Sequence, residues 1–275
     1  MKMQILSILL LCAGASNNAH AADSNAKTDL TSQAPATLPA NYKKTLTELF
    51  KNHESFAEAA GAIRALATQD AAWKPCLADA QCAGKIIKLI HNFYPSPNNN
   101  ASEAQGMLAA SLGTTGSFDW CKSQSEKKPK LAYYLPLFLA TACQQSHPNI
   151  DVVTHCLQKG INVNATAGGG TILYPAALPA AAMHGHTELV KLLLDHNANI
   201  EIVCPLVHCT PLMAAAYNGR NEIVDLLITR KANVNNKNRM GMTALKLAQK
   251  RVITVEENTP YKTIIELLKN AGAQE

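Results

Sequence analysis

The sequence predicts an all-α fold in which a small helical N-terminal region precedes a stack of repeated helical units. Two observations lead to this prediction. Apolar residues recur at helical spacing between Asn41 and Gln124, and four similar segment ends recur from residue 131 onward. The chain has 275 residues, of which 47% are hydrophobic, so it is long enough to bury a sizeable core.

The first residues follow the pattern of an export signal. Lys2 is followed by an apolar run from Ile5 to Ala13, and Ala19-His20-Ala21 is a small-x-small cleavage site. The run is about half of the roughly 20 residues that a membrane span requires. We therefore expect a signal peptide over 1–21, a disordered leader over 22–40, and a mature protein that is periplasmic in a bacterium and otherwise secreted. An uncleaved anchor is the alternative.

The region 41–124 has helical spacing but no internal repeat. We expect Asn41 to cap its first helix, and a later helix over 102–112 to stop at Gly113. A charged stretch from Glu126 to Lys130 has the composition of a linker. The sequence therefore predicts a small helical domain over 41–124, to which we assign no family.

The C-terminal half repeats itself. Four segments end alike, and the matching positions Gly160, Asn197, Lys231 and Gly272 are separated by 37, 34 and 41 residues. Periods of this size are typical of helical repeat proteins, in which each unit buries its apolar face against its neighbours.

The third segment resembles the ankyrin repeat. It opens with Thr210-Pro211-Leu212-Met213-Ala214-Ala215 and has Asn218-Gly219-Arg220-Asn221-Glu222-Ile223-Val224 at its centre. The resemblance implies an ankyrin-repeat solenoid of about four repeats. Their bounds are about 131–164, 165–201, 202–235 and 236–275, and the first and last are degenerate, as the ends of a solenoid must be.

Each matching residue has a physical role. Thr210 can cap the first helix of its repeat, and Pro211 suits the first helical turn because its missing N–H has no partner there. Gly185 and Gly219 suit a left-handed turn between two helices. At the next turn Lys231 takes a position that favours glycine, so we expect a small strain there.

The sequence gives no sign of catalytic or metal chemistry. It contains no G-x-S-x-G motif, and ankyrin repeats have no inherent active site. His184 and His186 flank a turn glycine and are interpreted as part of the repeat rather than as metal ligands. The glycines 168–170 lack the following Lys-Ser/Thr of a phosphate loop and are interpreted as a hairpin tip. We therefore expect no catalytic residue, no metal, no cofactor and no enzyme activity.

Seven cysteines remain after cleavage, an odd number, so at least one is free or intermolecular. Cys204 and Cys209 frame a short loop and are predicted to form a disulfide. We expect that Cys76 and Cys82 pair with each other, or that one of them pairs with Cys121. Two further cysteines in the first repeat either join its helices or remain buried thiols.

The stretch from Arg220 to Arg251 is basic. It holds eight Lys and Arg residues against Glu222 and Asp225. The stretch is either a solvated surface or a patch for an acidic protein partner. Nucleic acid is disfavoured as a partner because no aromatic residues interleave with these charges. No segment further along the chain approaches the length of an apolar membrane span, and we expect a monomer in isolation.

The ankyrin resemblance implies binding through hairpin fingertips and the concave inner-helix face. At the predicted fingertips, apolar side chains or Arg stand where a solvated turn would be polar. The predicted partner-binding residues are Ile172, Leu173, Tyr174, Leu206, Val207, Arg239 and Met240 at the fingertips and Met183, His184, Tyr217 and Asn218 on the inner face. For residues 172–174 the alternative is a core anchor of a shortened repeat.

The leading hypothesis is an exported, non-enzymatic protein-binding module. It would neutralise a toxin or enzyme, as an immunity protein does, or scaffold an envelope protein. One alternative is that the domain over 41–124 has an activity of its own and the repeats target it. Another is that the chain is a secreted effector that acts on host proteins.

Overall fold

A computed structural model describes residues 37–52, 56–70, 72–93, 101–144, 148–166, 168–169, 172–173, 176–204, 208–254 and 259–274. The predicted signal peptide and most of the predicted leader therefore lie outside the described residues. In chain order the elements are α2 (Tyr42–Lys51), α3 (Phe56–Gln69), α4 (Trp73–Ala78), α5 (Ala80–Phe93), α6 (Ala101–Leu112), α7 (Thr115–Ser125), η1 (Pro129–Tyr134), α8 (Leu135–Gln144), α9 (Ile150–Gln158), β1 (Gly168–Gly169), β2 (Ile172–Leu173), α10 (Ala177–His184), α11 (Thr187–Asp195), α12 (Pro211–Tyr217), α13 (Asn221–Thr229), α14 (Ala244–Thr254) and α15 (Thr259–Asn270).

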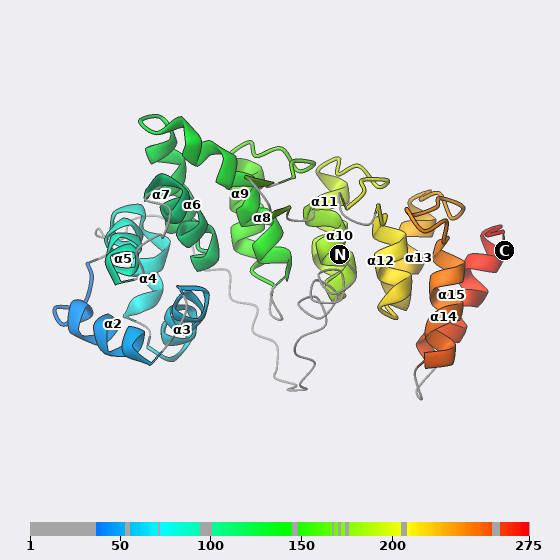
Figure 1. The fold of residues 1–275 in the computed structure, drawn as a ribbon, viewed down its shortest axis with the longest axis horizontal. Helices are drawn as coiled ribbons and strands as arrows, with labels where there is room; N and C mark the ends of the chain where they lie inside the picture. The colour runs from blue at the N-terminus through cyan, green and yellow to red at the C-terminus, as the bar shows by residue number, and fades with distance from the viewer. Residues whose placement is uncertain are drawn as a thin grey trace. The chain divides into compact units, whose positions relative to one another are not determined.

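From α8 onward the helices pack as successive pairs (Figure 1): α8 with α9, α10 with α11, α12 with α13 and α14 with α15. The first helices of the pairs pack on one another in the order α8, α10, α12, α14, and we call them the inner helices. The second helices are the outer helices, and among them α13 packs on both α11 and α15. The predicted all-α stack of helical repeats is confirmed.

Small side chains and a defined cap produce the inner helices. Ala181 in α10 and Ala215 in α12 are fully buried, and alanines at such positions let neighbouring helices approach closely. The hydroxyl oxygen of Thr210 accepts a hydrogen bond from the backbone N–H of Met213 at 3.3 Å, and Pro211 occupies the first helical turn. The predicted roles of Thr210 and Pro211 are confirmed.

The turns adopt the left-handed backbone that the sequence predicts. Gly185 and Gly219, between inner and outer helices, have φ angles of 88° and 70°. At the next turn Asn197 and Lys231 have φ angles of 62° and 68°. A left-handed conformation costs a non-glycine residue roughly 1–2 kcal/mol, with asparagine paying least, so Lys231 carries the strain that its identity predicts.

The described residues of the N-terminal half contain a helix pair that belongs to the same stack. Helices α6 and α7 pack on each other, α6 packs on the inner helix α8, and α7 packs on the outer helix α9. Gly113, which joins them, has a φ of 56°, like the turn glycines of the repeats. The sequence predicts helices here without a repeat. Residues Pro35–Glu275 nevertheless form one compact unit.

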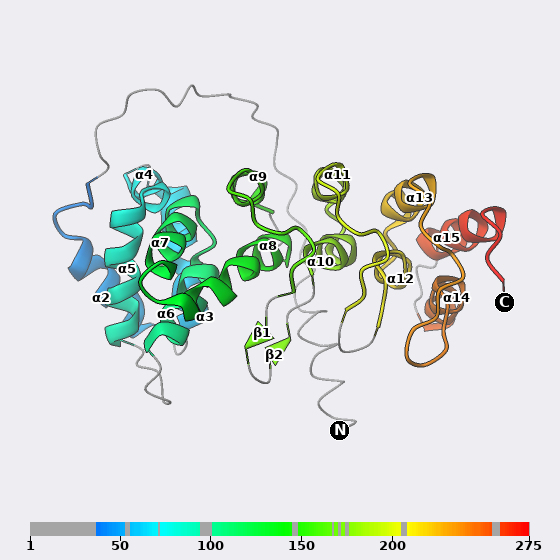
Figure 2. The same ribbon diagram turned by 90° about the horizontal axis from the view of Figure 1, so that it is seen from above.

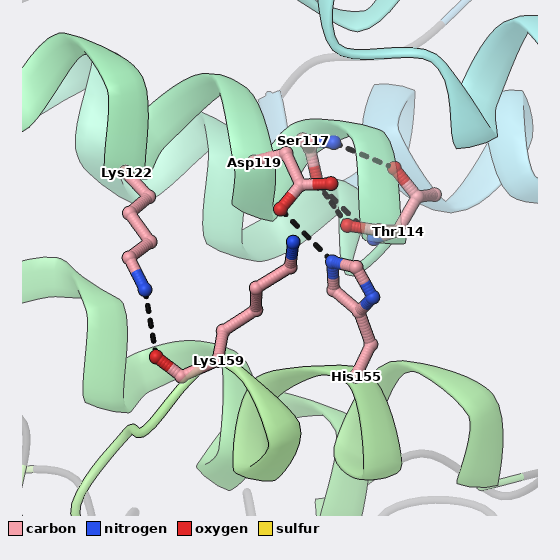
Figure 3. A network of polar contacts seen from close by, with 6 residues as sticks. All are labelled: Thr114, Ser117, Asp119, Lys122, His155 and Lys159. Carbon is pink, nitrogen blue, oxygen red and sulfur yellow. Dashed lines mark hydrogen bonds and ion pairs between the residues drawn. The ribbon is translucent and has the colours of Figure 1, made fainter.

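The seam between α7 and the pair α8–α9 is apolar where α7 meets α8, and it is polar at its edge, where α7 meets α9 (Figure 3 shows the polar edge). The rings of Phe118 and Phe138 meet edge to face with centroids 5.3 Å apart. At the edge, Asp119 Oδ1 lies 2.9 Å from His155 Nε2. The ammonium group of Lys122 donates a hydrogen bond of 2.7 Å to the carbonyl oxygen of Lys159, which closes the C-terminal end of α9.

Helices α3 and α5 continue the packing beyond this seam, α3 against α6 and α5 against α7. A Cβ atom on Gly84 would lie 2.4 Å from the indole of Trp120, so glycine is needed where α5 meets α7. The expected cap at the start of α2 is wrong in one respect. Asn41 occupies the N-cap position, but its side chain makes no cap hydrogen bond, because its backbone (φ −95°, ψ 10°) is not the extended one that capping requires.

A short hairpin projects from the second repeat. β1 and β2 are antiparallel, with Gly168 opposite Leu173 and Gly169 opposite Ile172. The hairpin is as predicted, except that Gly168 and Gly169 lie in a strand and not at the tip. Figure 2 shows the hairpin on the side opposite the outer helices, where the α11–α12 and α13–α14 connections also project. η1 begins within the predicted linker and contacts β1.

Candidate functional site

Four of the predicted partner-binding residues lie at the ends of two inner helices that pack on each other. Met183 and His184 end α10, and Tyr217 ends α12 with Asn218 immediately after it. All four side chains are half-buried. We call the solvent-facing side of α8, α10, α12 and α14, together with the turns that follow α10 and α12, the inner-helix face.

A guanidinium group is held by two tyrosine rings on this face. The Cζ atom of Arg251, in α14, lies 5.0 Å from the ring centroid of Tyr217 and 5.7 Å from that of Tyr261. Its Nε donates to the Tyr261 hydroxyl at 3.4 Å, and that hydroxyl donates to the carbonyl oxygen of Tyr217 at 3.3 Å. Cation–π attraction and these bonds fix the position of the positive charge.

A second cation lies at the turn after α10. Nε of Arg220 donates to the carbonyl oxygen of Met183 at 3.3 Å. The rings of His184 and His186 stack with centroids 6.0 Å apart. Burial of the imidazole, followed by the nearby His186 and Arg220, lowers the pKa of His184 below its usual value. His184 is therefore neutral at pH 7, and Arg220 supplies the positive charge of this turn.

The charged side chains on the helices of the inner-helix face are all positive. The residues of α8, α10, α12 and α14 include no aspartate or glutamate, and α14 carries Lys246, Lys250 and Arg251. Lys246 and Lys250 are exposed. Glu256 and Glu257, which follow α14 in the sequence, lie outside the described residues. The outer helices mix both signs, and Arg230 of α13 pairs with Asp195 of α11 at 3.0 Å.

The basic stretch from Arg220 to Arg251 therefore does not form one patch. Four of its cations lie on the inner-helix face, namely Arg220, Lys246, Lys250 and Arg251. Lys237 and Arg239 lie on the connection before α14, while Arg230 and Lys231 lie at the end of an outer helix. Sequence reasoning missed Tyr261, because it stands in a degenerate repeat. The feature of the sequence that could have pointed to Tyr261 is an aromatic residue in an otherwise polar turn of α15.

The described fingertip residues are exposed, and hydrogen bonds hold the connection that carries them. Met240 is 67% exposed, and Arg239 is also exposed, with its Nη2 3.0 Å from Nε2 of His208. The side chain of Asn238 accepts hydrogen bonds from the backbone N–H groups of Met240 and Met242. Tyr174, Leu206 and Val207 lie outside the described residues, and for Ile172 and Leu173 the structure describes the backbone alone.

The described cysteines are free thiols, so the predicted disulfides are not formed in this structure and stay predictions. Cys204 and Cys209 are neighbours, since the backbone N–H of Cys204 donates to the carbonyl oxygen of Cys209 at 3.0 Å.

The thiols of Cys76 and Cys82 lie within hydrogen-bond reach of each other. Cys121 instead lies 3.8 Å from the carbonyl oxygen of Leu131. Burial raises the pKa of the Cys121 thiol to about 12, so it is protonated and unreactive at neutral pH.

Within the described part of the chain, no group of three or more His, Cys, Asp or Glu side chains is placed to hold a metal ion. No helix in the same part is long and apolar enough to cross a bilayer. The stacked pair of His184 and His186 agrees with their interpretation as residues of a repeat turn.

Comparison with protein families finds a match to ankyrin repeats, in three copies, over residues 178–274. Comparison with curated proteins finds no match. The family match begins within α10, whereas α8, α9 and the helix pair α6–α7 before them pack in the same stack.

Proposed function

Residues 178–274 are ankyrin repeats, and from this premise we propose that the protein is an exported, non-enzymatic module that binds an acidic partner protein. Ankyrin repeats are protein-interaction modules, and the inner-helix face is the surface that we assign to the partner. The observation that carries the assignment is the charge of this face: none of its four helices bears a carboxylate, and α14 bears three cations.

The tyrosine-held Arg251 supports this assignment. A guanidinium presents several donors in a plane that matches a carboxylate. Because Tyr217 and Tyr261 already fix its position, Arg251 loses little conformational freedom when a carboxylate binds. The exposed Lys246 and Lys250 add long-range attraction, which raises the association rate.

We further propose that the partner is a toxin or enzyme that the module neutralises, or an envelope protein that it scaffolds. This role requires export through the signal peptide over 1–21 and thus an oxidising compartment. There Cys204 and Cys209 would form a disulfide: their two thiols lose two protons and two electrons to an oxidised dithiol protein, which is thereby reduced. The hydrogen-bonded backbones of the two residues support this pairing.

The test is differential capture from the envelope fraction of the native cell. The bait is the mature chain, either wild type or with Lys246, Lys250 and Arg251 each changed to Glu. The matched control changes two exposed lysines of an outer helix, Lys262→Glu and Lys269→Glu. We expect the wild type and the control to retain the same acidic protein and the α14 variant to lose it.

Two results would contradict the proposal. One is a partner that the α14 variant retains as well as the wild type does. The other is capture that the outer-helix control abolishes, since a bulk-charge effect would then explain binding. Circular dichroism of each variant separates lost binding from lost folding. Reversal of the four exposed lysines should leave the melting temperature within a few degrees, whereas Arg251→Glu also removes the contacts with Tyr217 and Tyr261 and should lower it further.

A further inference from the structure

Two thiols lie side by side where α4 meets α5. Cys76 belongs to α4 and Cys82 to the first turn of α5, and their side chains lie within hydrogen-bond reach of each other. Both residues are buried. The thiol of Cys121 contacts a different group, the carbonyl oxygen of Leu131. The structure therefore favours Cys82 over Cys121 as the disulfide partner of Cys76.

The connection between the two helices fixes this arrangement. The backbone N–H of Asp79 donates to the carbonyl oxygen of Pro75 at 3.1 Å and so closes the end of α4. The carboxylate of Asp79 accepts a hydrogen bond of 2.8 Å from the backbone N–H of Cys82, in the first turn of α5. Because one residue holds both helix ends, a disulfide between the two cysteines would link segments that are already fixed beside each other.

The Cys76 thiol also contacts the segment that precedes α2. Its Sγ atom lies 3.2 Å from the carbonyl oxygen of Thr37 and 3.3 Å from that of Ala72. Burial raises the pKa of the Cys76 thiol, so the thiol keeps its proton at neutral pH and can donate it to these oxygens. The thiol therefore joins α4 to a residue that stands 39 positions earlier in the chain.

We call residues 37–41 the N-terminal strap. The side chain of Leu38 packs against the hydrophobic core. The carbonyl oxygen of Pro39 accepts a hydrogen bond of 2.9 Å from the backbone N–H of Tyr42, the first residue of α2. The strap is thus held on the molecule by apolar packing at Leu38 and by the thiol at Thr37. The second of these contacts depends on a proton that oxidation of the thiol removes.

We propose that Cys76 and Cys82 form an oxidation site that controls how firmly the N-terminal strap is held. In the reduced protein, the Cys76 thiol donates its proton to the carbonyl oxygen of Thr37. Oxidation breaks the two S–H bonds and forms one S–S bond, and the two protons and two electrons pass to a disulfide compound such as oxidised glutathione, which becomes two thiols. Thr37 then has no thiol donor, and the strap loosens while Leu38 stays packed.

The test measures hydrogen exchange in the mature chain after refolding in reduced or in oxidised glutathione. Mass spectrometry of a proteolytic digest identifies the linked cysteines. We expect a disulfide between Cys76 and Cys82 in the oxidised sample. We also expect the Tyr42 amide, which bonds to the strap, to exchange about fivefold faster than in the reduced sample, the size of effect that one neutral hydrogen bond produces.

Two variants separate loss of the thiol proton from other effects of oxidation. Cys82→Ser cannot form this disulfide but keeps the Cys76 thiol, so the Tyr42 amide should exchange slowly in both buffers. Its other cysteines can still be oxidised, which makes it the matched control. Cys76→Ala removes the donor without any disulfide, so exchange should be as fast in both buffers as in the oxidised wild type. Circular dichroism shows whether each variant is folded.

Three results would overturn the inference. The first is an oxidised wild type in which Cys76 and Cys82 remain thiols or in which one of them is linked to Cys121. The second is a disulfide between Cys76 and Cys82 that leaves exchange at Tyr42 unchanged. The third is slow exchange in Cys76→Ala, since the thiol would then not hold the strap. Because the test involves no partner and no export, its failure leaves the proposed function untouched.

Discussion

The pair α6–α7 and the pair α12–α13 take the same arrangement from different sequences. In both, an inner helix is joined to an outer helix through a positive-φ glycine, Gly113 in the first pair and Gly219 in the second. In α12–α13 the signals are explicit: Thr210 caps the inner helix and Pro211 follows. In α6–α7 the cap stands instead on the outer helix, where Thr114 and Ser117 form a capping box.

The difference shows what the stack requires. A new pair must present an inner and an outer apolar face to the pair before it, and any sequence that does so extends the stack. The ankyrin signature is one way to meet this requirement. The predictions below test whether α6–α7 belongs to the stack energetically as well as by packing, from the largest expected effect to the smallest.

The largest effect is expected at the apolar centre of the seam. Phe118 in α7 is fully buried, so Phe118→Ala should lower the free energy of unfolding by about 3–5 kcal/mol. Because neighbouring pairs of a solenoid stabilise each other, the amide protection of α10 and α12 should fall too. Hydrogen exchange measures both effects. Unchanged protection in α10 and α12, with loss confined to α2–α7, would show a separate N-terminal domain.

A smaller loss is expected where α7 meets the α4–α5 connection. A Cβ atom on Gly116 would lie 2.6 Å from the backbone oxygen of Leu77, so Gly116→Ala should cost about 1–3 kcal/mol by overpacking. Gly160→Asn is the matched control: Gly160 has a φ of 79° with open space around it, and asparagine tolerates that conformation. Chemical denaturation compares the two, and a control as damaging as Gly116→Ala would contradict the packing account.

The polar edge of the seam should contribute less. The side chains of Asp119 and His155 are 33% and 23% exposed, so their pairing is partly screened by water. Asp119→Asn should lower the free energy of unfolding by about 0.5–1 kcal/mol at low salt, and less at high salt. A loss as large as that of Phe118→Ala would mean that the polar edge, and not the apolar centre, holds the seam.

The smallest effect is a pH dependence at His184. Its folded pKa lies below the ordinary value of 6.5, so the unfolded chain binds a proton more readily. The resulting stability is present above that value and is lost as the pH falls from 6.5 through the folded pKa. His184→Asn should flatten the fall in melting temperature over this range. An unchanged slope would show that burial, together with the nearby His186 and Arg220, does not lower the pKa of His184.

The repeats could be predicted because their turn and cap residues act locally. The positive φ angles of Gly185, Gly219 and Lys231 follow from the positions of these residues within a repeat. The cap at Thr210 follows because this residue stands immediately before the helix. The role of α6–α7 could not be predicted in this way. Its place in the stack depends on contacts such as Phe118 with Phe138, which no local pattern encodes.

The candidate site was predictable in part for a similar reason. Tyr217 and Asn218 could be placed on the inner-helix face by their offset from Gly219. The charge asymmetry of that face could not be predicted, because the basic stretch divides among three surfaces only once it is folded. The Arg251 site needed Tyr261, ten residues further along and on the next helix.

One measurement tests the central claim, that the side of the stack bearing the inner helices binds the partner. Hydrogen exchange is followed on the wild-type mature chain with and without its captured partner. We predict slower exchange in α12, α14 and the connections that precede them, with α11, α13 and α15 unchanged. Slower exchange in those three outer helices, with the inner helices unchanged, would contradict the account.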